Sequence, residues 1–250
     1  MIEPILDVSR WQDYIDKQKF LAAGALGIII RAGSQDDSGP YMDYQFENNA
    51  QKFNGEIPCG YYWYFRPEYS ASTQATYFAN LMRSVRTDIF PMIDVESNFK
   101  KVSMGVYQNR LYEFMSIVED LMGMESMIYT RATFWNPNVG DPPWAGSRRL
   151  VIARYTSQSK PWGNIYDQSW LKPLPWDDWW MWQYSADGNG RGAEFGVKSA
   201  DIDINRYNGT LEQFHKEIGW NQGDSTESKM CHFVRLVKEL CEKYLKEHCE

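Results

Sequence analysis

The sequence has no long hydrophobic run. Nowhere does it approach the roughly 18 consecutive apolar residues that a membrane-spanning helix needs. The amino terminus, Met1-Ile2-Glu3-Pro4, has neither the positively charged segment nor the apolar segment of a secretion signal. The sequence therefore predicts no membrane partner, and no signal peptide is visible in it.

Cysteine and histidine are also scarce. The four cysteines are too few and too unevenly spread for a disulfide framework, and the three histidines all come late in the chain. A zinc site built from the late cysteines and His248 is a weak alternative, because their spacing fits no familiar site. We therefore expect neither a disulfide-stabilised fold nor a metal or other cofactor.

The chain lacks an excess of basic residues as well. It has 26 Lys and Arg against 33 Asp and Glu, a net charge of -7, which argues against a nucleic-acid partner because phosphate binding requires basic patches. Aromatic residues are abundant instead, at 16% with 11 Trp and 16 Tyr. Such side chains offer flat apolar surfaces that can stack on sugar rings.

One short predicted strand, Pro91-Met92-Ile93-Asp94-Val95-Glu96, ends in two acidic residues. Residues i and i+2 of a strand share a face, which places the Cα atoms of Asp94 and Glu96 roughly 6.5 Å apart. Two carboxylates so close cannot both ionise easily, so we expect one raised pKa, as a general acid requires. Such acids can also cap a helix or pair with an arginine, so the rest of the chain must decide.

Eight strands are predicted, and amphipathic helices follow the early ones. The strands are expected at residues 5–9, 27–33, 59–65, 91–96, 127–130, 150–155, 179–184 and 202–205. Helices are expected at 10–25, from Asp43, and at 70–86 and 103–122, whereas later connections are rich in Pro and Trp. The pattern predicts an α/β fold, an irregular (β/α)8 TIM-type barrel with some helices missing.

Four acids, Asp7, Asp94, Glu96 and Asp203, lie at or near the C-terminal ends of predicted strands. In a barrel of this type those ends form the catalytic face. Acids from separate parts of the chain that meet at one mouth indicate a functional site. A Mg²⁺ site is the weaker alternative, since oxygen ligands also suit that ion but these are spread over several strands.

Several short motifs follow one another through the first 215 residues. They are Asp7-Val8-Ser9 with Trp11-Gln12, Gly60-x-Tyr62, Asp94-Val95-Glu96, Ile128-Tyr129-Thr130, Ala153-x-Tyr155, Trp182-Gln183-Tyr184 and Asp203-x-Asn205. In this order they resemble glycoside hydrolase family 25, the muramidases that include lysozymes and phage endolysins. One departure is Arg31, where many members carry a lysine, so that a planar fork replaces a point charge.

The resemblance implies a peptidoglycan hydrolase that cleaves the β-1,4 bond between N-acetylmuramic acid and N-acetylglucosamine. Glu96 would be the general acid, Asp94 its partner, and Asp7 and Asp203 would position Asp94, Arg31 or the sugar. The mechanism stays open between retaining, inverting and substrate-assisted routes, in the last of which the acetamido oxygen of the substrate attacks the anomeric carbon.

Further residues are expected to bind the glycan strand at the mouth. They are Arg31, Tyr62, Tyr64, Tyr129, Trp135, Tyr155, Gln183 and Asn205. Aromatic residues in strands are as often core as groove, so only those of the right parity would face the mouth. Gln183 could satisfy backbone groups, but its motif favours a hydrogen bond to sugar.

A different class of function remains as the alternative: a catalytically silent sugar-binding barrel, or a structural protein of a phage particle. The complete set of four acids favours an enzyme. A lysozyme with no visible signal is expected to be made in the host cytoplasm and to reach the wall after release, as a phage endolysin does. If a signal has been trimmed, the protein would be extracellular.

The C-terminal residues 227–250 are predicted to form an amphipathic helix, joined by a linker at 219–226 to a catalytic domain at 1–218. Met230, Phe233, Val237, Leu240 and Tyr244 are spaced by three and four residues along it. An apolar stripe of this kind must be covered. We therefore expect self-association or docking onto another protein through this helix, with packing against the barrel as the alternative.

Overall fold

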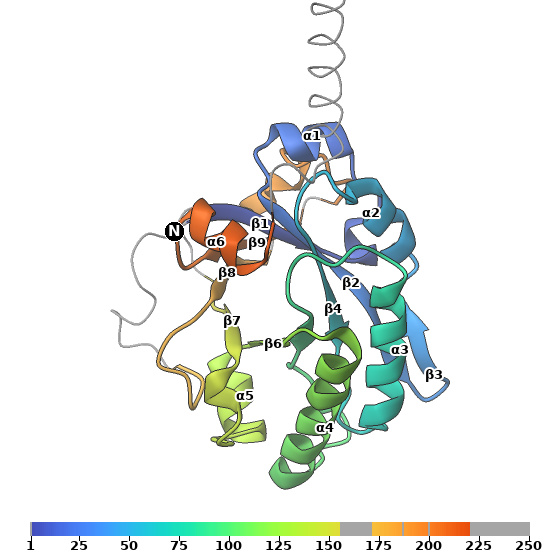
Figure 1. Cartoon of the computed structure of the whole chain (residues 1–250), viewed down its shortest axis with the longest axis vertical. Helices are drawn as coiled ribbons and strands as arrows, with labels where there is room; N and C mark the ends of the chain where they lie inside the picture. The colour runs from blue at the N-terminus through green and yellow to red at the C-terminus, as the bar shows by residue number, and fades with distance from the viewer. Residues whose placement is uncertain (1, 156–171, 187, 200, 221–250) are drawn as a thin grey trace, which may run out of the picture.

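The computed structural model describes residues 2–155, 172–186, 188–199 and 201–220 (Figure 1). The predicted C-terminal helix and most of its linker lie outside these residues. Within the described residues, no helix has both the length and the apolar character needed to cross a membrane.

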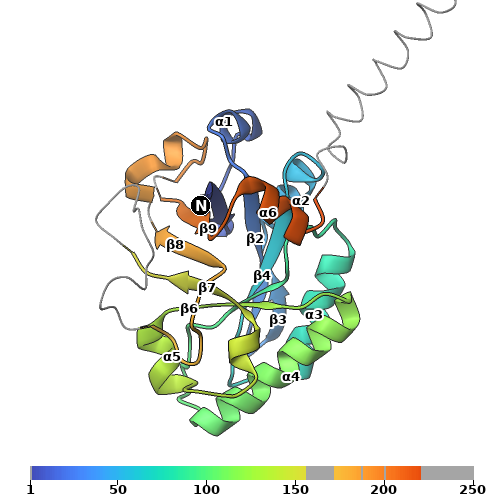
Figure 2. The same ribbon diagram turned by 60° about the vertical axis from the view of Figure 1, so that its left-hand side comes forward.

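Eight strands close into a barrel, as the sequence predicts. They are β1 (Ile2–Val8), β2 (Gly27–Asp36), β4 (Cys59–Tyr64), β5 (Met92–Asp94), β6 (Met127–Thr130), β7 (Arg149–Ala153), β8 (Met181–Ser185) and β9 (Asp203–Tyr207). Their order is β1-β9-β8-β7-β6-β5-β4-β2, and pairing of β1 with β2 completes the ring (Figures 1 and 2). The first and last strands of the barrel are therefore neighbours.

Two features of the sheet depart from the expected arrangement. Strand β9 runs antiparallel to both of its neighbours, β1 and β8, whereas the other barrel pairs are parallel. An extra strand, β3 (Gly39–Met42), pairs antiparallel with the end of β2, where the sequence predicts a polar loop. Gly33 permits this pairing, because a Cβ atom there would collide with the carbonyl oxygen of Tyr41.

The helices lie outside the barrel. They are α1 (Lys17–Ala22), α2 (Phe46–Phe53), α3 (Ala71–Arg83), α4 (Met104–Met122), α5 (Ala132–Asn138) and α6 (Leu211–Glu217). Ser70 caps α3 by accepting a hydrogen bond from the backbone of Thr73 at 3.2 Å. The start and end of α3 and α4 agree closely with the helices expected at 70–86 and 103–122.

The helix expected at 10–25 is wrong in its extent. A single 3₁₀ turn forms at Arg10–Gln12, and the chain breaks at Asp13, whose φ of 54° is left-handed. Helix α1 starts only after Asp16, whose side chain accepts from the backbone of Lys19 at 3.1 Å. Each of the two caps, Ser9 and Asp16, accepts a hydrogen bond from the backbone of the turn that follows it, so the segment forms a 3₁₀ turn and a short helix instead of one long helix.

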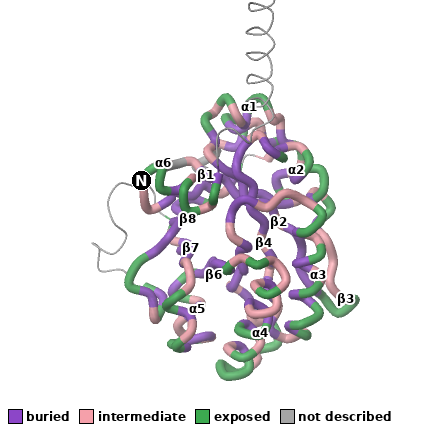
Figure 3. Tube along the Cα trace, in the orientation of Figure 1, coloured by how far each residue is buried: buried purple, intermediate pink, exposed green. Residues whose placement is uncertain are grey.

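Alternation along the strands separates an outer core from an inner one. Residues such as Ile28, Ile30 and Trp63 point outward and pack beneath the helices. Residues of the other parity fill the inside of the barrel, among them Ile5, Ile29, Met92, Met127, Val151 and Met181. Figure 3 shows the strands as the buried centre, with exposed residues along the outer helices. The closed, apolar end of the barrel therefore leaves only its opposite end for a polar site.

Candidate active site

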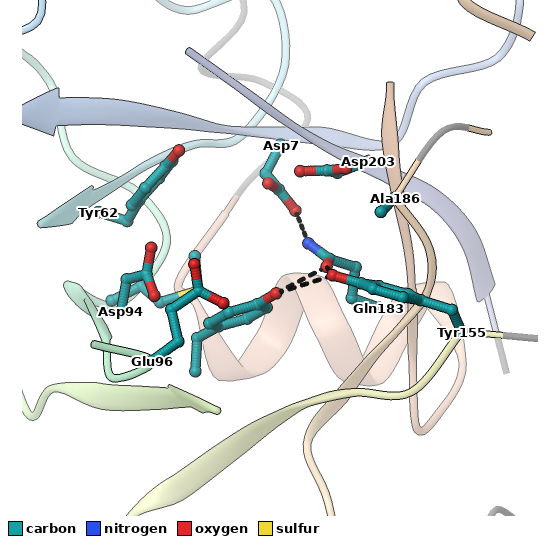
Figure 4. Close-up of a pocket in the computed structure, with 10 residues that line it drawn as sticks. Asp7, Tyr62, Asp94, Glu96, Tyr155, Gln183, Ala186 and Asp203 are labelled. Carbon is teal, nitrogen blue, oxygen red and sulfur yellow. Dashed lines mark hydrogen bonds between the residues drawn. The ribbon is translucent and has the colours of Figure 1, made fainter. Parts of the chain in front are cut away.

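A polar layer lies directly above the inner apolar core. On four strands, a polar residue follows two positions after an inner apolar residue, and residues two apart on a strand face the same side, here the inside of the barrel. The polar residues are Asp7, Asp94, Tyr129 and Gln183, which follow Ile5, Met92, Met127 and Met181. These residues form the walls of a pocket at the carboxyl ends of the parallel strands (Figure 4). Among the described residues, its lining is Asp7, Tyr62, Met92, Asp94, Glu96, Tyr129, Tyr155, Gln183, Ala186 and Asp203.

Asp7 is the centre of a hydrogen-bond network on one side of the pocket. Its Oδ2 accepts from Gln183 Nε2 and from Asn205 Nδ2, both at 2.8 Å. Burial raises the pKa of Asp7, while hydrogen bonds from Asn205, Asp203 and Gln183 work in the opposite direction. Burial and then the negative charge of Asp7 raise the pKa of Asp203 well above its ordinary value, and the two side chains share a hydrogen bond.

Gln183 connects this network to two tyrosines. Its Oε1 accepts from the hydroxyl of Tyr129 at 2.8 Å and from that of Tyr155 at 3.0 Å. Its Nε2 donates to Asp7, and the side chain is almost fully buried. Both ends of the amide are thus bonded to protein groups. Gln183 fixes the positions of its neighbours, and its carbonyl oxygen is not left for a sugar.

Asp94 and Glu96 lie on the other side of the pocket. Burial and then the negative charge of Glu96 raise the pKa of Asp94 well above its ordinary value. Burial also raises the pKa of Glu96, against the opposing effect of the Arg131 and Arg31 cations. One oxygen of Asp94, Oδ1, is buried without a hydrogen-bond partner. Both pKa values are therefore shifted upward, the direction that a general acid requires.

Arg31 and Tyr64 lie beside the pocket but do not line it. The register of the sheet pairs Tyr64 with Asp94, and the guanidinium of Arg31 lies 5.2 Å from the centre of the Tyr64 ring. Arg31 Nε is buried without a hydrogen-bond partner. The positive charge of Arg31 opposes the rise in the pKa of Asp94. Arg31 thus acts on the acids through its charge.

Two residues expected to bind substrate are placed elsewhere. Trp135 is fully buried, its Nε1 donates to the carbonyl oxygen of Gly140 at 2.7 Å, and its ring packs against Trp176 in the outer core. Asn205 is also fully buried and donates to Asp7 and to the carbonyl oxygen of Ile5. Trp135 stabilises the fold and Asn205 holds Asp7, so neither is placed to contact a sugar.

Sequence reasoning missed three residues at or near the pocket. Met92 and Ala186 line it, and Arg131 acts electrostatically on both acids of the pair. The alternation of side chains along a strand could have identified two of them, because Met92 lies on the same face as Asp94, and Arg131 on the same face as Tyr129. Among the described residues, no group of three or more His, Cys, Asp or Glu side chains is arranged to hold a metal ion.

Two acids on one strand at the carboxyl end of a barrel, with further acids opposite, form the kind of site that glycoside hydrolases use. The family model "Glycosyl hydrolases family 25" matches residues 6–193, and the chain belongs to this family. A relative in sequence is "Uncharacterized protein YegX" of Escherichia coli K12, 29% identical over 215 residues, which cover 83% of this chain and 70% of that protein.

Solved structures share the fold. The bacterial lysozyme from Streptomyces coelicolor is similar with a TM-score of 0.68 and 23% identity, over 90% of this chain and all of that one. The muramidase from Acremonium alcalophilum gives a TM-score of 0.67 and 20% identity, over 89% and 100% of the two chains. The spore cortex lytic enzyme SleM of Clostridium perfringens gives 0.69 and 24%, over 84% and 68%. The irregular barrel is therefore the fold of this family.

Proposed function

We propose that this glycoside hydrolase family 25 chain is an N-acetylmuramidase that cleaves the β-1,4 bond between N-acetylmuramic acid and N-acetylglucosamine in peptidoglycan. The observation that carries the proposal is the pair Asp94 and Glu96, two acids with raised pKa values on one face of a strand in an open pocket. The names of similar structures, lysozyme and muramidase, support bacterial wall glycan as the substrate class.

The geometry suits a division of labour between the two sides of the pocket. Glu96 is the less buried acid of its pair, so it is the one that protonates the leaving glycosidic oxygen. Asp94, deeper and beside it, would hold the acetamido group of the substrate, whose oxygen then attacks the anomeric carbon. Asp7 and Asp203 lie across the pocket (Figure 4), where negative charge would stabilise the positive charge that develops on the sugar ring.

The test compares the protein with Glu96→Gln on purified cell walls, by loss of turbidity and by release of reducing sugar ends. Glutamine keeps the shape of the side chain but has no acidic proton to transfer, so the rate should fall by about 100-fold or more. Glu113→Gln is the matched control, because Glu113 is exposed on α4 away from the pocket. It should clear walls at the normal rate.

Two results would contradict the proposal in different ways. If Glu96→Gln clears walls as fast as the unchanged protein, Glu96 is not the general acid. If the unchanged protein binds walls but releases no reducing ends, the barrel is a sugar-binding module that does not catalyse. Thermal melting of both variants shows whether either result comes from misfolding.

A further inference from the structure

Arg131 is the next inward-facing residue above Tyr129, beside Glu96. Asp94 pairs with Tyr129 in the register of β5 and β6. The pairing continues past the end of β5, because Val95 N donates to the carbonyl oxygen of Tyr129 at 2.9 Å and Thr130 Oγ1 donates to that of Val95 at 2.7 Å. Arg131 is still extended, with φ −119° and ψ 146°. Two residues beyond Asp94 and Tyr129, Glu96 and Arg131 therefore neighbour each other on the same face.

The Arg131 side chain is exposed and forms neither a hydrogen bond nor an ion pair with any residue in the described part of the chain. Two other cations on loops at this end of the barrel are paired with acids. Arg66 bonds to Glu68 at 2.5 Å, and Lys100 bonds to Asp37 at 2.8 Å. A guanidinium that no protein carboxylate occupies, at the rim of a pocket, is available to a ligand.

The position of Arg131 is unfavourable for the chemistry of Glu96 alone. Its positive charge lowers the pKa of Glu96, whereas a general acid that works near neutral pH needs a raised one. The pocket also contains Asp7, Asp94 and Asp203, which would repel an anionic substrate. A cation at the rim offsets that repulsion. Both facts are accounted for if the substrate brings a negative charge to Arg131.

We propose that Arg131 binds a carboxylate of the substrate, on the lactyl-peptide substituent of the muramic sugar next to the bond that is cleaved. The planar guanidinium fork matches a carboxylate with two parallel hydrogen bonds. Arg131 thus distinguishes anionic wall glycan from neutral glycans of the same backbone. The inference rests on the proposed function, since only a glycan that contains muramic acid offers this group.

The experiment compares two substrates that differ mainly in charge. One is soluble, uncrosslinked peptidoglycan strands, and the other is the same strands with their carboxylates converted to methylamides. The unchanged protein should show a kcat/KM about tenfold higher on the charged strands, the effect of one good charge-assisted contact. Arg131→Gln should lose about tenfold on the charged strands and little on the neutral ones, so that its preference disappears. Arg131→Lys should keep part of the preference.

Lys100→Gln is the matched control, because it removes another exposed cation at the same end of the barrel and should keep the normal preference. Equal losses on both substrates in Arg131→Gln would overturn the inference, because they would mean that Arg131 acts on Glu96 or on the fold. A preference that is absent in the unchanged protein would also overturn it. If the unchanged protein cleaves neither substrate, the proposed function itself fails.

Discussion

Asp203 and Asp7 illustrate how burial and hydrogen bonding set the charge of this pocket. Burial and the negative charge of Asp7 raise the pKa of Asp203, and the two side chains share a hydrogen bond. The pKa of Asp203 in the folded protein is therefore higher than in the unfolded chain. Its contribution to stability is complete below the unfolded pKa of about 3.9 and is lost as pH rises through the folded value.

Asp203→Asn should therefore change how stability depends on pH. Asparagine cannot ionise but can still donate a hydrogen bond to Asp7. The variant should melt at a higher temperature than the unchanged protein at pH 8, and at nearly the same temperature at pH 4. Thermal melts over this pH range provide the measurement, with exposed Asp120→Asn as the control. If the difference in melting temperature between Asp203→Asn and the unchanged protein is the same at every pH, Asp203 ionises as readily in the folded protein as in the unfolded chain.

Gln183 is a positioning residue, and its effect should appear in the pH profile of activity. Its Nε2 donates to Asp7 and lowers the pKa of that acid. Gln183→Met keeps the size of the side chain but removes this bond, so the pKa of Asp7 rises and the acidic limb of the kcat profile should move to higher pH. Loss of the hydrogen bonds from the Tyr129 and Tyr155 hydroxyls to Gln183 should also lower the free energy of unfolding, by about 1–3 kcal/mol.

The matched control for Gln183 is Tyr155→Phe. It removes one phenol from Gln183 Oε1 but leaves the bond between Gln183 and Asp7 in place. Its acidic limb should stay where it is, whatever happens to substrate affinity. A profile of Gln183→Met that falls in height without moving along the pH axis would show that Gln183 does not control Asp7.

At the scale of elements, alternation and motif order predicted the eight barrel strands, because each strand carries an apolar face that requires burial. The antiparallel direction of β9 could not be predicted, since it depends on the path of the chain around the whole barrel. The helix expected at 10–25 failed for a local reason. Trp11, which completes its apolar stripe, is 68% exposed, while Ile15 and Phe20 are fully buried.

The same limit applies to the candidate site. Parity within one strand predicted that Asp94 and Glu96 face the same way. It could not show that Asn205 and Gln183 are committed to Asp7, because those bonds join residues 198 and 176 positions apart. Nor could it show that Trp135 packs against Trp176, since that contact forms outside the barrel. Sequence pattern finds the face of a residue, and tertiary structure decides its partner.

The end of the packed unit extends beyond the domain boundary expected at residue 218. Trp220 is 7% exposed, its backbone N donates to the carbonyl oxygen of His215 at 2.8 Å, and the guanidinium of Arg86 lies 4.8 Å from its ring. Trp220 thus packs the segment after α6 against the loop that follows α3. A truncation that tests the C-terminal tail should leave Trp220 in place.

A chain that ends at Trp220 should fold and keep its activity, because every described residue that lines the pocket precedes it. If the predicted helix at 227–250 mediates self-association, as we propose, this truncation should lower the mass measured by light scattering. A chain that ends at Gly219 should be less stable by about 3 kcal/mol, the effect of losing a buried tryptophan. Equal stability of the two truncations would show that Trp220 contributes nothing to the fold.

At the scale of the whole molecule, the barrel has two ends of opposite character. The inner core fills one end with Ile5, Met92, Met127 and their neighbours, and Phe214 of α6 packs against it. The other end contains the acids, the tyrosines and Gln183. Several buried polar groups there, such as Asp7, Gln183 and Asn205, are tolerated because they bond to one another. The apolar end supplies the stability that a concentration of buried acids would otherwise remove.

The pairing of β1 with β9 has a consequence for the newborn chain. Asp7 is made about 200 residues before Asn205 and Asp203, which hold it, and synthesis adds roughly 5–20 residues per second. Until then the ring is open at the place where β1 later lies against β9. A partly translated chain therefore carries Glu96 but lacks the complete pocket. The pocket forms only when β9, the last strand to be made, closes the barrel.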